Sequence, residues 1–251
     1  GATRDLLDHR QPAALHLGDA SSLIDLGSFT DCLHGHDLRR SLRFEIGWTL
    51  PQRMEVRDPL GAGSRYQGDR MRLEVALAAD KARQAEVRSL SYALSSGTDE
   101  VLDVVLGRDE RHRLQLTSAH YGFQLAEGRK WPLEAPEKFY RLSDASIARY
   151  RNAGFLADFA LATEAMLERV AYLGPLRSHP RRMYQWSGEA PASVGHMGEY
   201  AVAAILAAQG EGRRLSRGAG QGSRGFAAFI AAWLKDLGVI HGFAVRPVAE
   251  G

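Results

Sequence analysis

The stretch "LRFEIGWTL", residues 42–50, decides the fold, because apolar and polar side chains alternate along its whole length. A period of two places these two sets on opposite faces of an extended strand, so one face is buried and the other faces water or a partner. The same period returns in "MRLEVALA" from Met71 and in "SLSYALSS" from Ser89, and more weakly in "VLDVVLG" and "RHRLQLTS". Short turns separate the later runs, and the sequence therefore predicts an antiparallel meander.

The periodicity changes at "LEAPEKFYRLSD", residues 133–144. Pro136 interrupts any strand ladder, and the Ser and Asp that end the stretch can cap a following helix. Apolar residues then recur every three or four positions over residues 145–170, which predicts a helix. Gly154 lies near its middle, so we expect a kink or two shorter helices.

The remaining pattern is also mainly helical. Two more helices are predicted at residues 197–209 and 226–237, and a short strand in "FAVRPV" near the C-terminus. The fold class is therefore α+β, with an antiparallel β-rich lobe followed by a mainly helical segment with short strands. We place the lobe at residues 1–135 and the helical segment at residues 136–251.

Composition and motifs exclude several classes of function. No apolar run is long enough to cross a bilayer, and the N-terminus lacks the apolar core of a signal peptide, so we expect a cytoplasmic protein without a membrane partner. The single cysteine, Cys32, excludes an intrachain disulfide and a multi-cysteine metal site. The sequence also lacks a P-loop, a G-x-S-x-G elbow and an H-E-x-x-H motif. No catalytic residue is assigned.

The segment "HGH" raises one metal hypothesis. His34 and His36, with the adjacent Asp37, offer two imidazoles and a carboxylate that could hold a metal ion. Two histidines beside a turn glycine are more often surface residues. We assign no metal site and keep a small metal enzyme as a third hypothesis.

Arginine clusters are the strongest binding signal. All but four of the 32 basic residues are arginine, although the net charge is only +2. In "YLGPLRSHPRRMY", residues 172–184, a Gly-Pro turn would make Arg177, Arg181 and Arg182 project together. Such a group could grip phosphate or DNA through bidentate guanidinium contacts. The alternative is structural, with Arg177 paired to an acid such as Glu199.

A second arginine group lies in the glycine-rich stretch between the last two predicted helices. Arg213, Arg214 and Arg217 could contact a phosphate backbone. The simpler interpretation is a solvated loop whose charge serves solubility.

The segment "GHMGE", residues 195–199, is expected to start a helix. Free N–H groups at a helix N-terminus would favour an anion near Gly195 and Gly198. Glu199 would lie in the first turn, where its carboxylate could instead interact with the helix dipole.

Three stretches resemble a known family. They are "LGDASSLIDLGSFTDCLHGHDLRRSLRFEI", residues 17–46; "VAYLGPLRSHPRRMYQWSGEAPASVGHMGEYAVAAIL", residues 170–206; and "WLKDLGVIHGFAVRPVAEG", residues 233–251. Their order and spacing are similar to those of prokaryotic AAA-annotated ATPases of the ABC type, related to the SMC, RecF and overcoming-lysogenization-defect proteins. The G-P-L-R and V-G-x-x-G-E pair carries most of the resemblance.

The resemblance implies a protein that hydrolyses ATP with Mg²⁺ between paired heads of a homodimer and acts on DNA, in repair or antiphage defence. This chain matches the central portion of such a protein, between the Walker A motif and the signature motif. It lacks Walker A, the signature and Walker B, and we expect it to bind no ATP and to be inactive alone. We expect a fragment or one part of a larger polypeptide.

A second hypothesis comes from a different class. The chain would be a non-enzymatic module that holds nucleic acid or a protein partner through its arginine-rich loops. Both hypotheses use the same arginines, and they differ in whether the intact protein contains a phosphate-binding loop.

Overall fold

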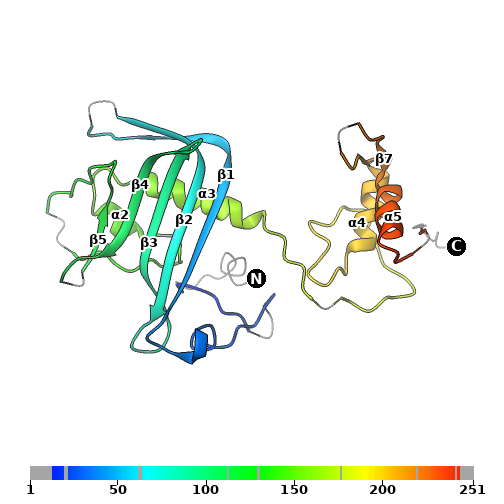
Figure 1. Cartoon of the computed structure of the whole chain (residues 1–251), viewed down its shortest axis with the longest axis horizontal. Helices are drawn as coiled ribbons and strands as arrows, with labels where there is room; N and C mark the ends of the chain where they lie inside the picture. Colours follow the sequence, from blue (N-terminus) through cyan, green and yellow to red (C-terminus); the bar gives the residue numbers. More distant parts are fainter. Residues whose placement is uncertain are drawn as a thin grey trace. The chain divides into compact units, whose positions relative to one another are not determined.

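The computed structural model in Figure 1 forms two compact units, residues 1–170 (unit 1) and residues 171–251 (unit 2), and each is described by itself. The structure describes residues 13–19, 22–61, 64–111, 113–128, 131–175, 177–218, 220–240 and 242–243.

Unit 1 is built on a five-stranded antiparallel sheet whose strands follow one another in sequence order (Figure 1). This order confirms the meander that alternating hydrophobicity predicts. The strands are β1 (Ser41–Arg57), β2 (Arg65–Ala79), β3 (Ala85–Ser96), β4 (Asp99–Arg108) and β5 (Leu114–Thr117).

The register places the alternating apolar side chains on one face. Phe44 on β1 lies opposite Val75 on β2, and Leu73 on β2 lies opposite Tyr92 on β3. Leu73, Val75 and Tyr92 are almost completely buried, whereas their polar neighbours point to the other face. Burial of this apolar face is the main stabilising contribution to unit 1.

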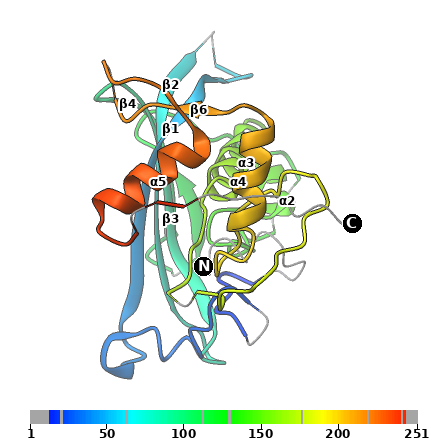
Figure 2. The same ribbon diagram turned by 90° about the vertical axis from the view of Figure 1, so that its right-hand side faces the viewer.

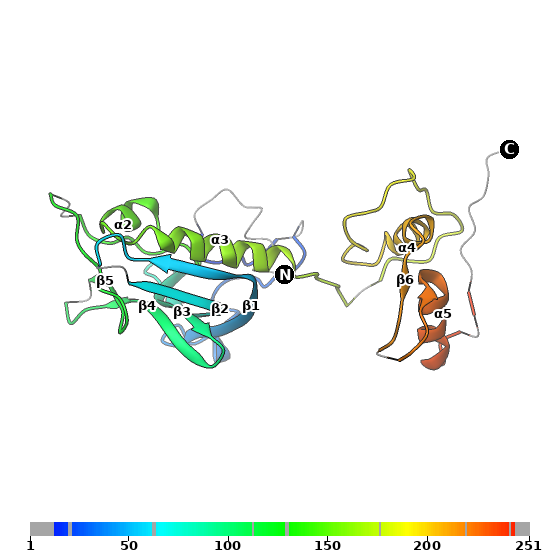
Figure 3. The same ribbon diagram turned by 90° about the horizontal axis from the view of Figure 1, so that it is seen from above.

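Two helices cover the apolar face, α2 (Asp144–Ala148) and α3 (Phe155–Glu168) (Figure 3). They confirm the expectation of two shorter helices around Gly154 in place of one long one. The ring of Phe159 packs edge-on against Tyr92 with the ring centroids 5.4 Å apart. Ser143 caps α2, because its side chain accepts a hydrogen bond from the backbone N–H of Ser146.

The compact unit that contains the sheet extends to Val170, beyond the boundary that we expected after residue 135. The physical reason is the interaction of α3 with the sheet. Tyr92 donates a hydrogen bond to the carbonyl oxygen of Tyr140 at 2.6 Å, and its hydroxyl lies 3.1 Å from the hydroxyl of Thr163 on α3. The α2–α3 segment therefore shares one core with the strands.

Unit 2 contains two helices that lie side by side and one small hairpin (Figure 2). Its elements are α4 (Ala201–Gly210), β6 (Arg214–Leu215), β7 (Arg224–Gly225) and α5 (Phe226–Asp236). Both predicted helices are present. The simpler interpretation of the glycine-rich stretch was a solvated loop, and the structure pairs its two ends as β6 and β7.

Helix α4 starts later than its predicted start at residue 197. Gly195 and Gly198 have positive φ angles of 80° and 77°, which lie outside the right-handed helical region. The "VAYLG" segment after α3, residues 170–174, forms neither a helix nor a strand. Most of the strand expected in "FAVRPV" lies outside the described residues. Within the described part of the chain, every helix is too short or too polar to span a membrane.

Candidate anion-binding site

The two segments that carry the G-P-L-R and V-G-x-x-G-E motifs lie against each other in unit 2. The backbone N–H of Gly174 donates to the carbonyl oxygen of His196 at 2.7 Å. The backbone N–H of Ser178 donates to the carbonyl oxygen of Met197 at 3.0 Å. A Cβ atom on Gly174 would lie 3.2 Å from the carbonyl oxygen of His196, which is a tight contact. The motifs thus form one local structure, which we call the GPLR corner (residues 174–175, 177–182 and 194–200).

Gly195 is required by the geometry of this corner. Its φ angle of +80° is unfavourable for any residue with a side chain. A Cβ atom there would lie only 2.3 Å from the carboxyl carbon of Glu199. Any side chain at this position would therefore displace the Glu199 carboxylate.

Glu199 holds the loop together. Its carboxylate accepts a hydrogen bond from the backbone N–H of Met197 at 2.9 Å and lies 3.5 Å from Nδ1 of His196. Hydrogen bonds from its own backbone N–H and from that of Met197, together with His196, lower the pKa of Glu199 despite the opposing effect of burial. The expected alternative, an ion pair between Glu199 and Arg177, is not formed.

The backbone N–H groups of this loop already have acceptors. Gly195 donates to the Ser193 hydroxyl at 3.2 Å, and Gly198 donates to the carbonyl oxygen of Gly195 at 3.3 Å. Helix α4 begins only at Ala201, and its N-cap residue Tyr200 makes no side-chain capping bond. An anion at Gly195 and Gly198 would therefore have to compete with bonds inside the loop.

The three arginines of the GPLR corner have no carboxylate partner in the part of the chain that the structure describes. Arg177 donates from Nη1 to the carbonyl oxygen of Gly174 and so closes the turn. Arg181 and Arg182 are exposed. Arg181 borders an open hollow of about 570 Å³, whose lining residues are Ser178, Arg181, Met183, Tyr184, Gln185, Glu199, Tyr200 and Ala203.

The arginines of the second group interact mainly with residues of the β6–β7 hairpin and of α5. Arg214 donates from Nη2 to the carbonyl oxygen of Ser223 at 2.6 Å. Arg217 forms an ion pair with Asp236 and lies over the Trp233 ring, with its guanidinium 4.4 Å from the centroid. These contacts brace β6 and β7 against α5.

Arg213 interacts more weakly, with its guanidinium 5.8 Å from the centre of the Phe226 ring. The hollow beside Arg217 is lined by Leu215, Arg217, Gln221, Gly222, Ser223, Arg224 and Phe229. It shares no residue with the hollow beside Arg181. The two hollows are therefore separate, and none of Arg177, Arg182 and Arg213 is among their lining residues.

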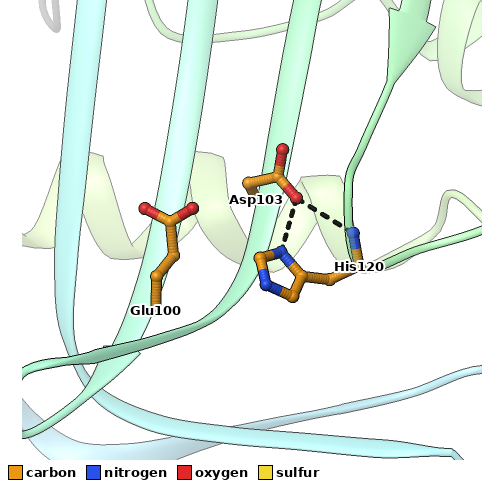
Figure 4. Close-up of side chains that lie close together, drawn as sticks. All are labelled: Glu100, Asp103 and His120. Carbon is orange, nitrogen blue, oxygen red and sulfur yellow. Dashed lines mark hydrogen bonds and ion pairs between the residues drawn. The ribbon is translucent and has the colours of Figure 1, made fainter.

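A further cluster that the sequence did not reveal lies on the polar face of the unit 1 sheet. Glu100 and Asp103 on β4 and His120 after β5 bring one potential ligand atom each within 4.8 Å of one another (Figure 4). The pairing register of β4 with β5 could have revealed this cluster. Val105 pairs with Thr117, so continuing the ladder by two residues carries Asp103 to the segment that holds His120.

The hydrogen bonds of Asp103 give it a structural role. Its Oδ1 lies 2.8 Å from Nδ1 of His120, accepts from the Ser118 hydroxyl at 2.8 Å and accepts from the Ala119 N–H at 2.8 Å. Burial would raise the pKa of Asp103, but these hydrogen bonds outweigh burial and lower it. Glu100 is paired with Arg72 at 3.0 Å. Both carboxylates are thus occupied by protein donors, and the cluster closes the turn after β5.

The "HGH" segment forms a short 3₁₀ turn, η1 (His34–His36), with no buried residue. Nδ1 of His36 lies 3.6 Å from the Asp31 carboxylate. Across the described ranges, neither histidine belongs to a group of three potential metal ligands. The metal-enzyme hypothesis gains no support from this turn.

Comparison of the chain with protein-family models, with curated proteins and with solved structures finds no match. The family resemblance of the GPLR corner therefore stays a prediction.

Proposed function

We propose that this chain is the central, non-catalytic portion of a larger ABC-type ATPase of the SMC, RecF and overcoming-lysogenization-defect group, and that unit 2 contacts nucleic-acid phosphates. The observation that carries the proposal is the GPLR corner. Two motifs about twenty residues apart in the sequence are joined by backbone hydrogen bonds, and the arginines beside them form no ion pair with a carboxylate among the described residues. Unpaired arginines are suited to phosphate recognition.

The apolar surface of α4 supports the idea of a larger parent protein. The sequence of this helix, "AVAAILAAQG", is apolar on all sides, yet only Ala207 and Ala208 are buried. A helix that is apolar all round normally lies inside a protein. We infer that further structure of the parent covers α4 in the intact protein.

The charge distribution supports a phosphate partner for unit 2. Basic residues outnumber acidic residues in residues 171–251, whereas acidic residues outnumber basic ones in residues 1–170. Local excess of positive charge attracts polyanions even when the net charge of the chain is small.

The residues of this chain do not fit the triphosphate of ATP. A triphosphate site needs a run of free backbone N–H groups and a lysine, and the loop glycines of the corner already donate their N–H groups within the loop. We derive no hydrolytic step for this chain. The same proposal holds that the parent protein binds ATP and Mg²⁺ between paired heads and acts in DNA repair or antiphage defence. Reading the gene on both sides of this segment tests it, because the parent must encode a P-loop upstream and a Walker B acid downstream.

Changing Arg181 and Arg182 together to glutamine should weaken binding to a labelled DNA duplex, measured by fluorescence anisotropy over a series of salt concentrations. The slope of log K against log salt should fall by about 0.9 for each lost phosphate contact. The change removes exposed charge and leaves the hydrogen bond of Arg177 intact, so the corner should stay folded.

The matched control changes Arg70 and Arg111 of unit 1 to glutamine, which removes the same charge from exposed positions outside unit 2. The control should leave the slope unchanged. Binding without salt dependence, or an equal loss in the control, would contradict a phosphate contact at the corner.

One observation favours a protein partner as a second candidate. Unit 2 exposes several large apolar side chains, among them Met183, which is 77% exposed, and Leu237, which is 68% exposed. Apolar surface of this kind is typical of protein interfaces. Under this alternative the chain is a non-enzymatic module, and the Arg181 and Arg182 change would leave partner binding largely intact.

A further inference from the structure

A groove of about 530 Å³ lies in unit 1, between residues 48–54 of β1 and the second half of α3. Helix α3 passes over the β1 side of the sheet (Figure 3). The pairing register of β1 with β2 shifts between Thr49 and Met54, so the four residues between them have no partner in β2. This irregular part of an edge strand forms one wall of the groove, and α3 forms the other.

The groove has an apolar interior. Trp48, Leu50 and Met54 line it from β1, and Ala162 and Met166 line it from α3, one helical turn apart. The small side chain of Ala162 leaves space, while the methionines can adapt to the shape of a ligand. Clefts of this size with an apolar and aromatic lining are typical of small-molecule sites.

The rim of the groove is positively charged. Arg53 extends from β1 and Arg169 follows the end of α3. Arg53 donates from Nη2 to the Ser96 hydroxyl at 2.7 Å, and neither arginine lies within ion-pair distance of a carboxylate in the described residues. No aspartate or glutamate is among the lining residues. An apolar cleft with this rim is complementary to a ligand that has an apolar body and an anionic head.

The indole N–H of Trp48 provides an independent observation. Nε1 is buried, and no acceptor for it exists among the described residues. A buried donor without an acceptor is unfavourable and is rare in native proteins. A small turn of the indole toward a ligand oxygen in the groove would satisfy this donor.

We propose that the groove between β1 and α3 binds a small amphipathic organic anion. Its apolar body lies along Trp48, Met54 and Met166, and its carboxylate or equivalent head lies at Arg169 and Arg53. The site belongs entirely to unit 1, so it is independent of the phosphate contact proposed for unit 2.

The test titrates the full chain with decanoate and, separately, with decanol, which has the same chain length and no charge. The readout is the NMR signal of the Trp48 indole N–H, identified by its loss in Trp48→Phe. Because this signal reports only the groove, binding of either probe to the exposed apolar surface of unit 2 does not interfere. We expect decanoate to shift the signal in a saturable manner and to bind more tightly than decanol.

Arg169→Gln should weaken decanoate binding about tenfold and leave decanol binding unchanged, because a charge-assisted hydrogen bond is lost. Arg111→Gln, in the exposed turn before β5, is the matched control and should behave as the unchanged chain does. The proposal is overturned if decanoate leaves the Trp48 signal in place at millimolar concentration. Equal binding of decanoate and decanol, unaffected by Arg169→Gln, would also overturn it, because the groove would then select no anion.

Discussion

At the scale of single residues, Asp103 is the side chain with the clearest pH-dependent role. Its pKa in the folded protein lies below the ordinary value of 3.8, because hydrogen bonds from His120, Ser118 and the backbone outweigh burial. Stabilisation by this carboxylate is therefore present above its unfolded pKa and is lost as the pH falls through the lower folded pKa. Acid should weaken the turn after β5 by protonating Asp103.

Asp103→Asn should lower the free energy of unfolding by about 1–2 kcal/mol at neutral pH, because the hydrogen bonds to a charged acceptor become weaker neutral ones. The difference from the unchanged chain should shrink as the pH falls below the folded pKa, where both side chains are neutral. Urea unfolding of both proteins over a pH series measures this difference.

Glu100→Gln is the control from the same cluster, and it should change the free energy of unfolding much less than Asp103→Asn does. Glu100 pairs with Arg72 in an exposed ion pair, and such pairs contribute about 0.5 kcal/mol or less. If Asp103→Asn were as stable as the unchanged chain at neutral pH, the carboxylate would not be holding the turn.

Single residues were also where prediction from the sequence was least complete. The partner of Glu199 was not predicted, because a short loop places His196 and not Arg177 beside it. The Asp103 and His120 pair was missed because the two residues meet only through strand pairing. A contact across a hairpin depends on register, which composition and motif spacing do not reveal.

At the scale of elements, two glycines of unit 1 should respond oppositely to alanine. Gly154 has helical angles, φ −57° and ψ −32°, and a Cβ atom there would meet nothing within 4 Å. Gly154→Ala should stabilise the protein by about 0.4–1 kcal/mol, because alanine loses less backbone entropy on folding. Thermal or urea unfolding measures the change.

Gly68 on β2 is the comparison. A Cβ atom at this buried position would lie 2.6 Å from Cγ of Leu94 and from the carbonyl oxygen of Ser95. Gly68→Ala should therefore destabilise the protein by roughly 1–3 kcal/mol through overpacking. If Gly154→Ala were destabilised as Gly68→Ala is, the prediction would be wrong, and residue 154 would be constrained by more than its backbone angles.

The elements themselves were largely predictable. Alternation identified all five strands of the sheet, and the helical period identified α3, because side-chain periodicity directly reflects which face is buried. Helices α4 and α5 were also predicted, although α4 is apolar on all sides and has no single buried face. The start of α4 and the β6–β7 pairing were not predicted. Both depend on backbone angles and pairing inside glycine-rich stretches, where side-chain periodicity gives no signal.

At the scale of the whole molecule, the apolar core is distributed very unequally. Apart from Ala207 and Ala208, every buried apolar residue of the described chain belongs to unit 1. Burial of apolar surface is the main favourable term in folding, and unit 2 buries little of it. The two units should therefore differ strongly in stability.

Hydrogen exchange of the full chain should show this difference directly. Backbone amides of β2 and β3, which lie in the centre of the sheet, should exchange only through global unfolding, whereas amides of α4 and α5 should exchange many times faster. A chain that ends at Val170 should keep the urea midpoint of the full chain, because truncation removes almost no buried apolar side chain. Strong protection of α4 in the full chain would contradict this prediction. It would mean that the all-apolar helix finds its cover within this chain, and the inferred need for further structure of a parent protein would then fall.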